Sequence, residues 1–201
     1  ELFQRIVAAG KNLSIMGHYN HPVEIRPAIA RQAIERIRST GATVRMQAPV
    51  IRHINENPAD WAALWTEGVR LGAVPYYMFV ERDTGPSHYF AMPLARAFEI
   101  FQAAYRTVSG LARTVRGPSM STFYGKVLIN GIETVAGEKV FVLQFLQARN
   151  PQWVLRTFYA RFDPQVTWFD DLQPAFGERA FFFQNELAAV PELIPVLLET
   201  A

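Results

Sequence analysis

Three short apolar segments alternate with three helix-like segments in the first 108 residues, and this alternation most limits the folds that the chain can adopt. The helix-like segments carry apolar residues at helical spacing, for example Ile29, Ala33, Ile34 and Ile37. In chain order, the six segments are 12–16, 28–38, 43–47, 58–70, 73–80 and 94–108. Strands that alternate with helices pair in parallel through right-handed crossovers. We therefore predict an α/β fold, either a barrel or a doubly wound sheet, with its sites at the C-terminal ends of the strands.

After about residue 110 the pattern changes to successive strands. The Gly-Pro-Ser sequence at 117–119 predicts a loop, and residues 127–132, 139–146 and 154–162 predict strands. Strands joined by short connections predict a small antiparallel sheet. We therefore divide the chain into residues 1–110, with partial (β/α) barrel units, and residues 111–201, a β-rich extension with a terminal helix at 191–200.

Composition indicates a folded protein and disfavours two kinds of partner. Half of the residues are hydrophobic and 19% are charged, as in chains that form a core. No apolar run approaches the roughly 20 residues of a membrane-spanning helix, so we expect no membrane partner. The net charge is +2 and the arginines are scattered among acidic residues, so we expect no nucleic-acid partner. The chain begins at Glu1, which suggests a truncated or processed N-terminus and prevents a judgement of targeting.

The chain contains no cysteine. It therefore supplies no disulfide, no thiolate metal ligand and no thiol nucleophile. His18 and His21 lie three positions apart, but a metal site needs three or four convergent ligands. We assign a metal ligand to none of the residues, and we expect His21, with Asn20 and Pro22, to shape its loop through hydrogen bonds.

Four blocks lie near the ends of the predicted elements. They are Met-Gly-His-Tyr-Asn-His-Pro at 16–22, Met-Gln-Ala-Pro-Val-Ile-Arg-His-Ile-Asn at 46–55, Pro-Tyr-Tyr-Met-Phe-Val-Glu-Arg-Asp at 75–83 and Tyr-Gly-Lys-Val at 124–127. Together and in this order, as far as about Gly177, they make the chain resemble the C-terminal half of the lysine 2,3-aminomutase family. The resemblance implies the last units of an open (β/α) radical S-adenosylmethionine barrel, followed by a small antiparallel β extension.

The resemblance also implies a reaction and its cofactors. Members of that family move an amino group from C2 to C3 of an amino acid, using pyridoxal phosphate, S-adenosylmethionine and a 4Fe-4S cluster. The cysteines that hold the cluster are absent from this chain, so we expect the chain alone to be inactive and to need a missing N-terminal barrel half. We further expect a cytoplasmic homo-oligomer that acts on a small amino acid.

Lys126 is the candidate for the lysine that binds pyridoxal phosphate covalently. Such a lysine must sit in a desolvated pocket that lowers its pKa and frees its nitrogen lone pair. Gly125 before it would permit a close approach of the backbone. The glycine run that precedes the family's cofactor lysine is replaced here by residues 119–124, Ser-Met-Ser-Thr-Phe-Tyr. The alternative interpretation is an exposed lysine in a turn.

Four further residues are candidates for binding the cofactors. By resemblance, His18 and Gln47 border S-adenosylmethionine, and Tyr76 and Tyr77 supply a flat wall beside the pyridine ring. The alternatives are a structural histidine, an inward amide satisfied by neighbouring strands, and aromatic core packing. His88 matches a histidine of the family, but we assign it no role.

Two arginines predict a departure from lysine as the substrate. In the family member that acts on lysine, two aspartates hold the distal ammonium group, and Arg82, beside Asp83, and Arg116 occupy the matching positions here. Replacing two anions by two cations would invert the preference of the pocket towards a carboxylate or phosphate. We therefore expect a substrate with an acidic or polar side chain.

Two other functions remain open at this point. The chain could be a non-catalytic truncated relative, a half-barrel that binds a ligand or a partner. It could also be a cluster-free pyridoxal phosphate enzyme, although no glycine- or serine-rich phosphate loop follows a strand. The aromatic segment 165–183 predicts internal packing in preference to an exposed interface. The unpaired strand edges of a half-barrel predict that these residues alone dimerise, aggregate or bind the missing half.

Overall fold

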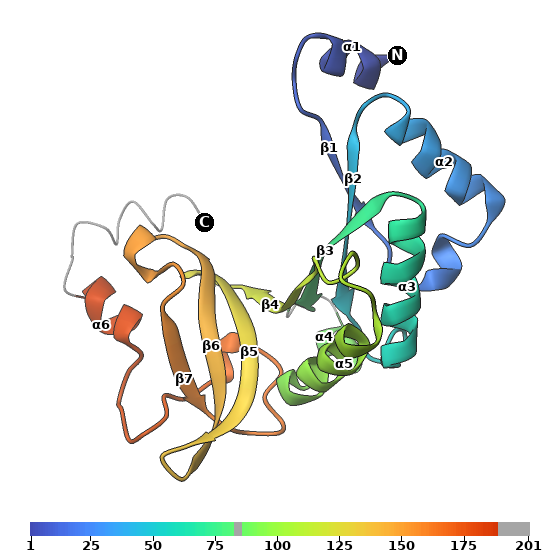
Figure 1. Ribbon diagram of the computed structural model, residues 1–201. Coiled ribbons are helices and arrows are strands. Elements are labelled where there is room, and N and C mark those ends of the chain that lie inside the picture. Colours follow the sequence, from blue (N-terminus) through green and yellow to red (C-terminus); the bar gives the residue numbers. More distant parts are fainter. Residues whose placement is uncertain (83–85, 189–201) are drawn as a thin grey trace.

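A computed structural model, which describes residues 1–82 and 86–188, contains one seven-stranded mixed sheet (Figure 1). Its strands follow one another in chain order: β1 (Ser14–His18), β2 (Thr43–Val50), β3 (Ala73–Val80), β4 (Arg116–Ser121), β5 (Gly125–Val135), β6 (Glu138–Ala148) and β7 (Thr157–Arg161). Strands β1 to β4 are parallel, whereas β4 to β7 are antiparallel. The α/β class is thus confirmed. That the parallel strands belong to half of a barrel stays a prediction.

Helices connect the parallel strands and extend beyond them at both ends of the chain. They are α1 (Leu2–Ala8), α2 (Ala28–Arg38), α3 (Pro58–Arg70), α4 (Ser87–Phe90), α5 (Leu94–Thr107) and α6 (Phe182–Ala188), with short 3₁₀ turns η1 (Pro22–Glu24), η2 (Pro151–Trp153) and η3 (Phe169–Asp171). The start of α3 follows directly from its sequence. The Asn57 side chain accepts a hydrogen bond from the Ala59 N–H at 3.1 Å, and Pro58 occupies the first turn, where its missing N–H has no helical partner to lose.

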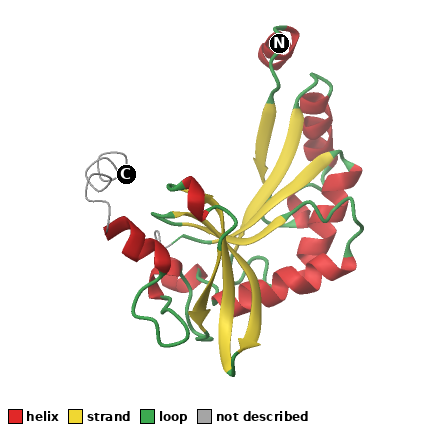
Figure 2. Ribbon diagram, turned by 60° about the vertical axis from the view of Figure 1, so that its left-hand side comes forward, coloured by secondary structure: helices red, strands yellow, loops and turns green. Residues whose placement is uncertain are grey.

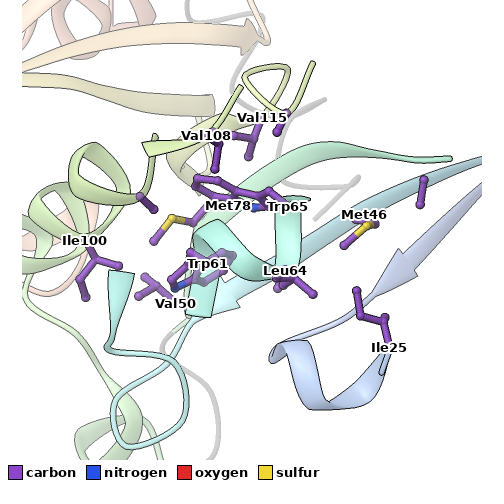
Figure 3. Close-up of a cluster of buried hydrophobic side chains, with 14 of the residues drawn as sticks. Ile25, Met46, Val50, Trp61, Leu64, Trp65, Met78, Ile100, Val108 and Val115 are labelled. Atoms are coloured by element: carbon purple, nitrogen blue, oxygen red, sulfur yellow. The ribbon is translucent and has the colours of Figure 1, made fainter. Parts of the chain in front are cut away.

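Among the residues that the structure describes, helices cover one face of the parallel strands and leave the other uncovered. Helix α2 packs on β2, α3 on β3, and α5 on β3 and β4; Figure 2 shows all three helices on one side of the strands. Along β2 buried and less buried residues alternate, because successive side chains point to opposite faces. Met46 and Val50 point towards the helices, where they meet Trp61, Leu64 and Trp65 of α3 (Figure 3).

A second core, rich in aromatic residues, lies under the antiparallel strands. Phe145 and Phe158 of the sheet pack against Phe169, Phe181 and Phe183 from the C-terminal segment. These side chains are buried, and neighbouring rings meet at centroid distances of 5.3 to 6.4 Å. The predicted packing of residues 165–183 is therefore confirmed.

The loop predicted at 117–119 is wrong, because these residues lie inside β4. A Cβ atom at Gly117 would come within 2.4 Å of the Met78 carbonyl oxygen, so glycine permits β4 to approach β3 closely. The resulting pairing joins Tyr77 to Arg116 and Phe79 to Ser119. The Gly-Pro sequence therefore occurs here where two strands lie close together, and not in a turn.

Several element boundaries also differ from the prediction. Strand β1 runs to His18 and β2 to Val50, β7 begins only after η2, and α1 and α4 were not predicted. The terminal helix predicted at 191–200 lies outside the described residues. Within the described part of the chain, none of the helices combines the length and apolar character that crossing a membrane requires.

Candidate functional site

Four of the residues singled out in the sequence form one row across the parallel strands. His18 on β1 is opposite Gln47 on β2, Gln47 is opposite Tyr77 on β3, and Tyr77 is opposite Arg116 on β4. Opposed residues of neighbouring strands point to the same face. Since Met46 and Met78, the neighbours of this row, face the helices, the row lies on the uncovered face. Sites had been predicted at the C-terminal ends of the strands. Gln47 and Tyr77 instead lie inside their strands.

A β-bulge brings Tyr76 to the same place. The pairing of β2 with β3 joins Met46 to Pro75 but Gln47 to Tyr77, so Tyr76 is an extra residue on β3. An inserted residue interrupts the alternation of side chains and redirects them. The two tyrosine rings consequently meet edge to face, with centroids 4.5 Å apart.

Three cations surround this pair of tyrosines. Lys126 Nζ lies 4.0 Å from the centroid of the Tyr77 ring. Arg116 Cζ lies 4.4 Å from the Tyr77 centroid and 4.5 Å from the Tyr76 centroid, and Arg45 Cζ lies 4.7 Å from the Tyr76 centroid. We call these five residues the tyrosine–cation cluster. Four of them were predicted as site residues, but Arg45 was not.

The charged side chains of the cluster are partly buried. Burial lowers the pKa of the Lys126 ammonium; the nearby Tyr76 raises it, and the positive charge of Arg116 lowers it further. Burial also raises the pKa of Tyr77, whose hydroxyl is enclosed without a hydrogen-bond partner in the structure. No ion pair within the described residues includes Arg45, Arg116 or Lys126. The cluster is therefore suited to an anion and to an amine that reacts in its neutral form.

Gly125 fixes the position of Lys126. Its φ of +149° lies outside the usual range of residues with a side chain, and a Cβ atom there would lie 2.2 Å from the Gln147 carbonyl oxygen. Lys126 follows as the second residue of β5, paired with Ser121 on β4 and Gln147 on β6. The predicted close approach at Gly125 is confirmed, and Lys126 is not an exposed turn lysine.

His18 and Gln47 form a polar pair beside the cluster. The Nε2 atoms of the two side chains are 2.8 Å apart, and the His18 ring lies against Phe79 with centroids 6.0 Å apart. His18 is exposed and Gln47 is half-buried. The pair therefore presents donors and acceptors to a ligand on the uncovered face.

Arg82 lies apart from this row. It continues the chain beyond β3, and its guanidinium donates a hydrogen bond to the Ser121 carbonyl oxygen at 3.4 Å. Together with Glu81 and His88 it lines a separate cavity of about 220 Å³, closed by Trp168 and Asp171. Burial raises the pKa of Glu81, and one of its carboxylate oxygens is enclosed without a partner in the structure. Neighbouring Asp83 lies outside the described residues.

His21 shapes its loop, as predicted. The Glu24 carboxylate accepts hydrogen bonds from the N–H groups of Asn20 and His21 at 2.8 and 2.9 Å, and His21 Nδ1 accepts one from the Val23 N–H at 3.3 Å. The buried Asn55 side chain ties the same loop to β2 by donating to the carbonyl oxygens of Asn20 and Pro49. In the ranges 1–82 and 86–188, no three His, Asp or Glu side chains converge as a metal site needs.

Sequence comparison relates this arrangement to known proteins. The chain is 33% identical over 172 residues, 85% of its length, to a protein of Aquifex aeolicus (strain VF5) described as "Putative L-lysine 2,3-aminomutase". This similarity supports the lysine 2,3-aminomutase family as the relatives of the chain. The chain corresponds to a C-terminal part of such proteins, as the four blocks had predicted.

Two other 2,3-aminomutases match shorter stretches of the chain. An L-lysine 2,3-aminomutase of Escherichia coli (strain K12) is 30% identical over 114 residues, 54% of this chain, and a glutamate 2,3-aminomutase of Clostridioides difficile (strain 630) is 26% identical over 95 residues, 47% of this chain. The matches span 44%, 33% and 22% of the three relatives, so the chain covers less than half of each. No protein-family model matches the chain.

Arg45 is the residue of the cluster that sequence reasoning missed. One signal was present, since Arg45 and Gln47 lie two positions apart on a strand and so share a face. That signal does not reveal the ring of Tyr76 beside it, because the position of this ring depends on the bulge in β3.

Proposed function

We propose that the chain is the C-terminal part of a 2,3-aminomutase that moves an amino group from C2 to C3 of an amino acid. The observation that carries this proposal is Lys126, a half-buried lysine of lowered pKa beside two tyrosines, in a chain that is similar to 2,3-aminomutases. Such an enzyme also needs the parallel strands to be half of a barrel, whose other half and cluster cysteines would lie outside these 201 residues.

The tyrosine–cation cluster fits pyridoxal phosphate. Lys126 would hold its aldehyde carbon covalently, because a neutral amine is the nucleophilic form and burial favours that form. Tyr76 and Tyr77, whose rings meet edge to face beside Lys126, would border the pyridine ring. When bound, pyridoxal phosphate supplies the carrier for the migrating amino group, and S-adenosylmethionine, with the reduced cluster, supplies the radical that starts the migration.

His18 and Gln47 fit the edge of a nucleoside. Their hydrogen-bonded side chains sit on the uncovered face, with Gln47 on the strand next to the tyrosines and His18 one strand further away. Each retains polar capacity for a ribose or an amino acid group. In this proposal they orient S-adenosylmethionine beside the substrate. The chain itself provides no thiolate for the 4Fe-4S cluster.

The substrate in this proposal carries an acidic or polar side chain. Arg116 lies in the cluster, where a lysine ammonium group would meet the positive charges of Arg116 and Arg45. Arg82 follows Tyr77 by five positions, which is roughly 16 Å of extended chain. Its guanidinium group lines the neighbouring cavity and does not belong to the tyrosine–cation cluster.

The test is to locate the pyridoxal phosphate on the full-length protein. After incubation with the cofactor and reduction with borohydride, mass spectrometry of peptides should find the phosphopyridoxyl group on Lys126. A Lys126→Ala variant should lose this label, and a Lys139→Ala variant, changed at an exposed lysine, should keep it. A protein labelled equally at exposed lysines, or not at all, would favour the alternative of a non-catalytic half-barrel that binds a ligand or partner.

A further inference from the structure

A tyrosine ring lies between two arginines that come from the strands on either side of it. Arg45 reaches Tyr76 from β2, and Arg116 reaches it from β4, with Cζ to centroid distances of 4.7 and 4.5 Å. Tyr76 occupies this position because it is the extra residue of the bulge in β3. The ring supports both guanidinium groups through cation–π contacts and limits their side-chain freedom.

The hydrogen-bonding capacity of both arginines is unused by the protein. Each guanidinium carries five N–H donors. Among the residues that the structure describes, neither group pairs with a carboxylate and neither donates to another protein atom. Both side chains are half-buried. Half-buried guanidinium groups whose donors are unpaired are suited to an anion with two or more oxygens.

We propose that Arg45 and Arg116 form the site for a carboxylate at the end of the substrate's side chain, and that the substrate is therefore a dicarboxylic amino acid. This inference rests on the proposed function, and it assigns the specificity to Arg45 and Arg116 and not to Arg82. Tyr76 is a positioning residue that holds the two guanidinium groups.

The arrangement of the cluster suits a short dicarboxylic substrate. Lys126 contacts Tyr77 at one end, Arg45 contacts Tyr76 at the other, and Arg116 contacts both rings, whose centroids are 4.5 Å apart. An amino acid whose amino group is held near Lys126 thus has its side chain directed along the tyrosine pair towards two cations. A phosphate of the cofactor has the same chemistry as a carboxylate, so the experiment has to separate these two anions.

The experiment compares ligands that differ only in charge. Equilibrium dialysis with the full-length protein, loaded with pyridoxal phosphate but without S-adenosylmethionine, would measure the Kd of L-glutamate against L-glutamine and of L-aspartate against L-asparagine. The wild-type protein should bind at least one acid more tightly than its amide. Arg45→Gln and Arg116→Gln should each weaken binding of that acid by about 10- to 100-fold and leave the amide nearly unchanged, because a hydrogen bond to a charged group is lost.

Matched variants distinguish carboxylate binding by the two arginines from a general effect of losing a positive charge or of misfolding. Arg36→Gln removes an exposed arginine of α2 and should change neither Kd. Tyr76→Phe keeps the ring and should keep the preference for the acid, whereas Tyr76→Leu should reduce it. Borohydride labelling of Lys126 in every variant reports whether the site is folded.

The outcomes of the two proposals can be told apart. If Lys126 takes no label even in the wild type, the proposed function fails. If Lys126 is labelled but Arg45→Gln binds acid and amide as the wild type does, only the carboxylate site is refuted. An Arg45→Gln variant that loses affinity for pyridoxal phosphate itself, with an unchanged ratio of acid to amide, would assign these arginines to the phosphate and would likewise overturn the inference.

Discussion

Lys126 is one of three lysines in the chain, and its surroundings differ from those of the other two. Lys11 and Lys139 are exposed, whereas Lys126 is half-buried between Tyr77 and the end of β6. Burial favours the neutral amine, and the charge of Arg116 adds to this effect, although Tyr76 opposes it. The fold thus favours the neutral, reactive form of one amine by partly burying it.

We expect Lys126 to react with an aldehyde at a lower pH than the exposed lysines do. Its pKa is lowered from 10.5, so the neutral fraction appears first at Lys126 as the pH rises. Reductive methylation across pH 6 to 10, followed by peptide mass spectrometry, would give the midpoint for each lysine. Arg116→Gln should shift the Lys126 midpoint upward, since a repelling charge is removed; equal midpoints at Lys126 and Lys139 would contradict this account.

The site could be predicted from the sequence only in part. Gln47 and Tyr77 lie on predicted strands, but His18 lies beyond the strand predicted at 12–16 and Arg116 on a strand that was not predicted. That these four residues share one face is therefore seen only in the strand pairing. Each of the four was nevertheless identified as a candidate from the sequence. Arg45 was not, because its contact with Tyr76 depends on a bulge, and a bulge leaves no mark in the hydrophobic pattern of β3.

At the scale of elements, the hairpin of β5 and β6 determines where Lys126 points. β5 pairs with β6 along its whole length, and its first residue, Gly125, touches the backbone of Gln147 and Ala148 more closely than a side chain would allow. The lysine is thus held by backbone contacts that depend on the absence of one Cβ atom.

Gly125→Ala should destabilise the protein by about 2–4 kcal/mol, because the new Cβ atom would meet Gln147 and the backbone would be strained at its φ. Urea unfolding would measure the change. Gly110→Ala is the matched control, since a Cβ atom there meets no atom within 4 Å, and it should stay within about 0.5 kcal/mol of the wild type. Equal effects of the two substitutions would show that the close contact is unimportant.

Besides the aromatic packing of Phe182 and Phe183, one carboxylate links helix α6 to the residues in and after η2. Glu186 accepts hydrogen bonds from Trp153 Nε1 at 2.6 Å and from Arg156 Nη1 at 2.7 Å. The hydrogen bond from Trp153, together with that from Arg156, lowers the pKa of this glutamate below 4.5. A carboxylate with a lowered pKa contributes stability above its unfolded pKa, and this contribution is lost as the pH falls through the folded value.

Glu186→Gln should therefore lower the melting temperature at pH 7, and the difference from the wild type should narrow as the pH falls below about 4.5. Thermal unfolding at a series of pH values would measure this. Glu133→Gln, on the exposed surface of β5, serves as the control and should leave the pH dependence unchanged. A constant difference at all pH values would indicate that the charge of Glu186 does not attach α6.

Most elements could be predicted because their signals are local. Residues 28–38, 58–70 and 73–80 have the bounds that periodicity and capping gave them. Strand β4 was predicted as a loop, because a Gly-Pro sequence is typical of turns. Its pairing with β3 cannot be seen in the local sequence. The antiparallel strands were found, but their full lengths depend on tertiary pairing, as the extension of β5 from Gly125 to Val135 shows.

At the scale of the whole molecule, the sheet ends at β1, which pairs only with β2. Its outer edge and its uncovered face, where Met16 is 39% exposed, have no protein cover among the described residues. Unpaired strand edges associate readily with other strands. The same edge is where a preceding strand of a longer protein would pair.

A protein of these 201 residues alone should consequently self-associate. Sedimentation velocity should show species larger than a monomer of 22.8 kDa at micromolar concentration. Met16→Lys places a charge on β1 and should shift the distribution towards monomer by several-fold. Leu111→Lys is the control at a 74% exposed position in a turn, and should have no effect; a wild-type chain that stays monomeric would refute the prediction.

The agreement between strand order and chain order bears on how the protein is made. Since every strand pairs with the one that precedes it in the chain, the ribosome releases each new strand next to a neighbour that is already available. Among the seven strands that the structure describes, none has to insert between two others. The sheet can therefore grow in the direction of translation, from β1 to β7, so that the Lys126 hairpin is added to a face that Tyr76, Tyr77 and Arg116 have already formed.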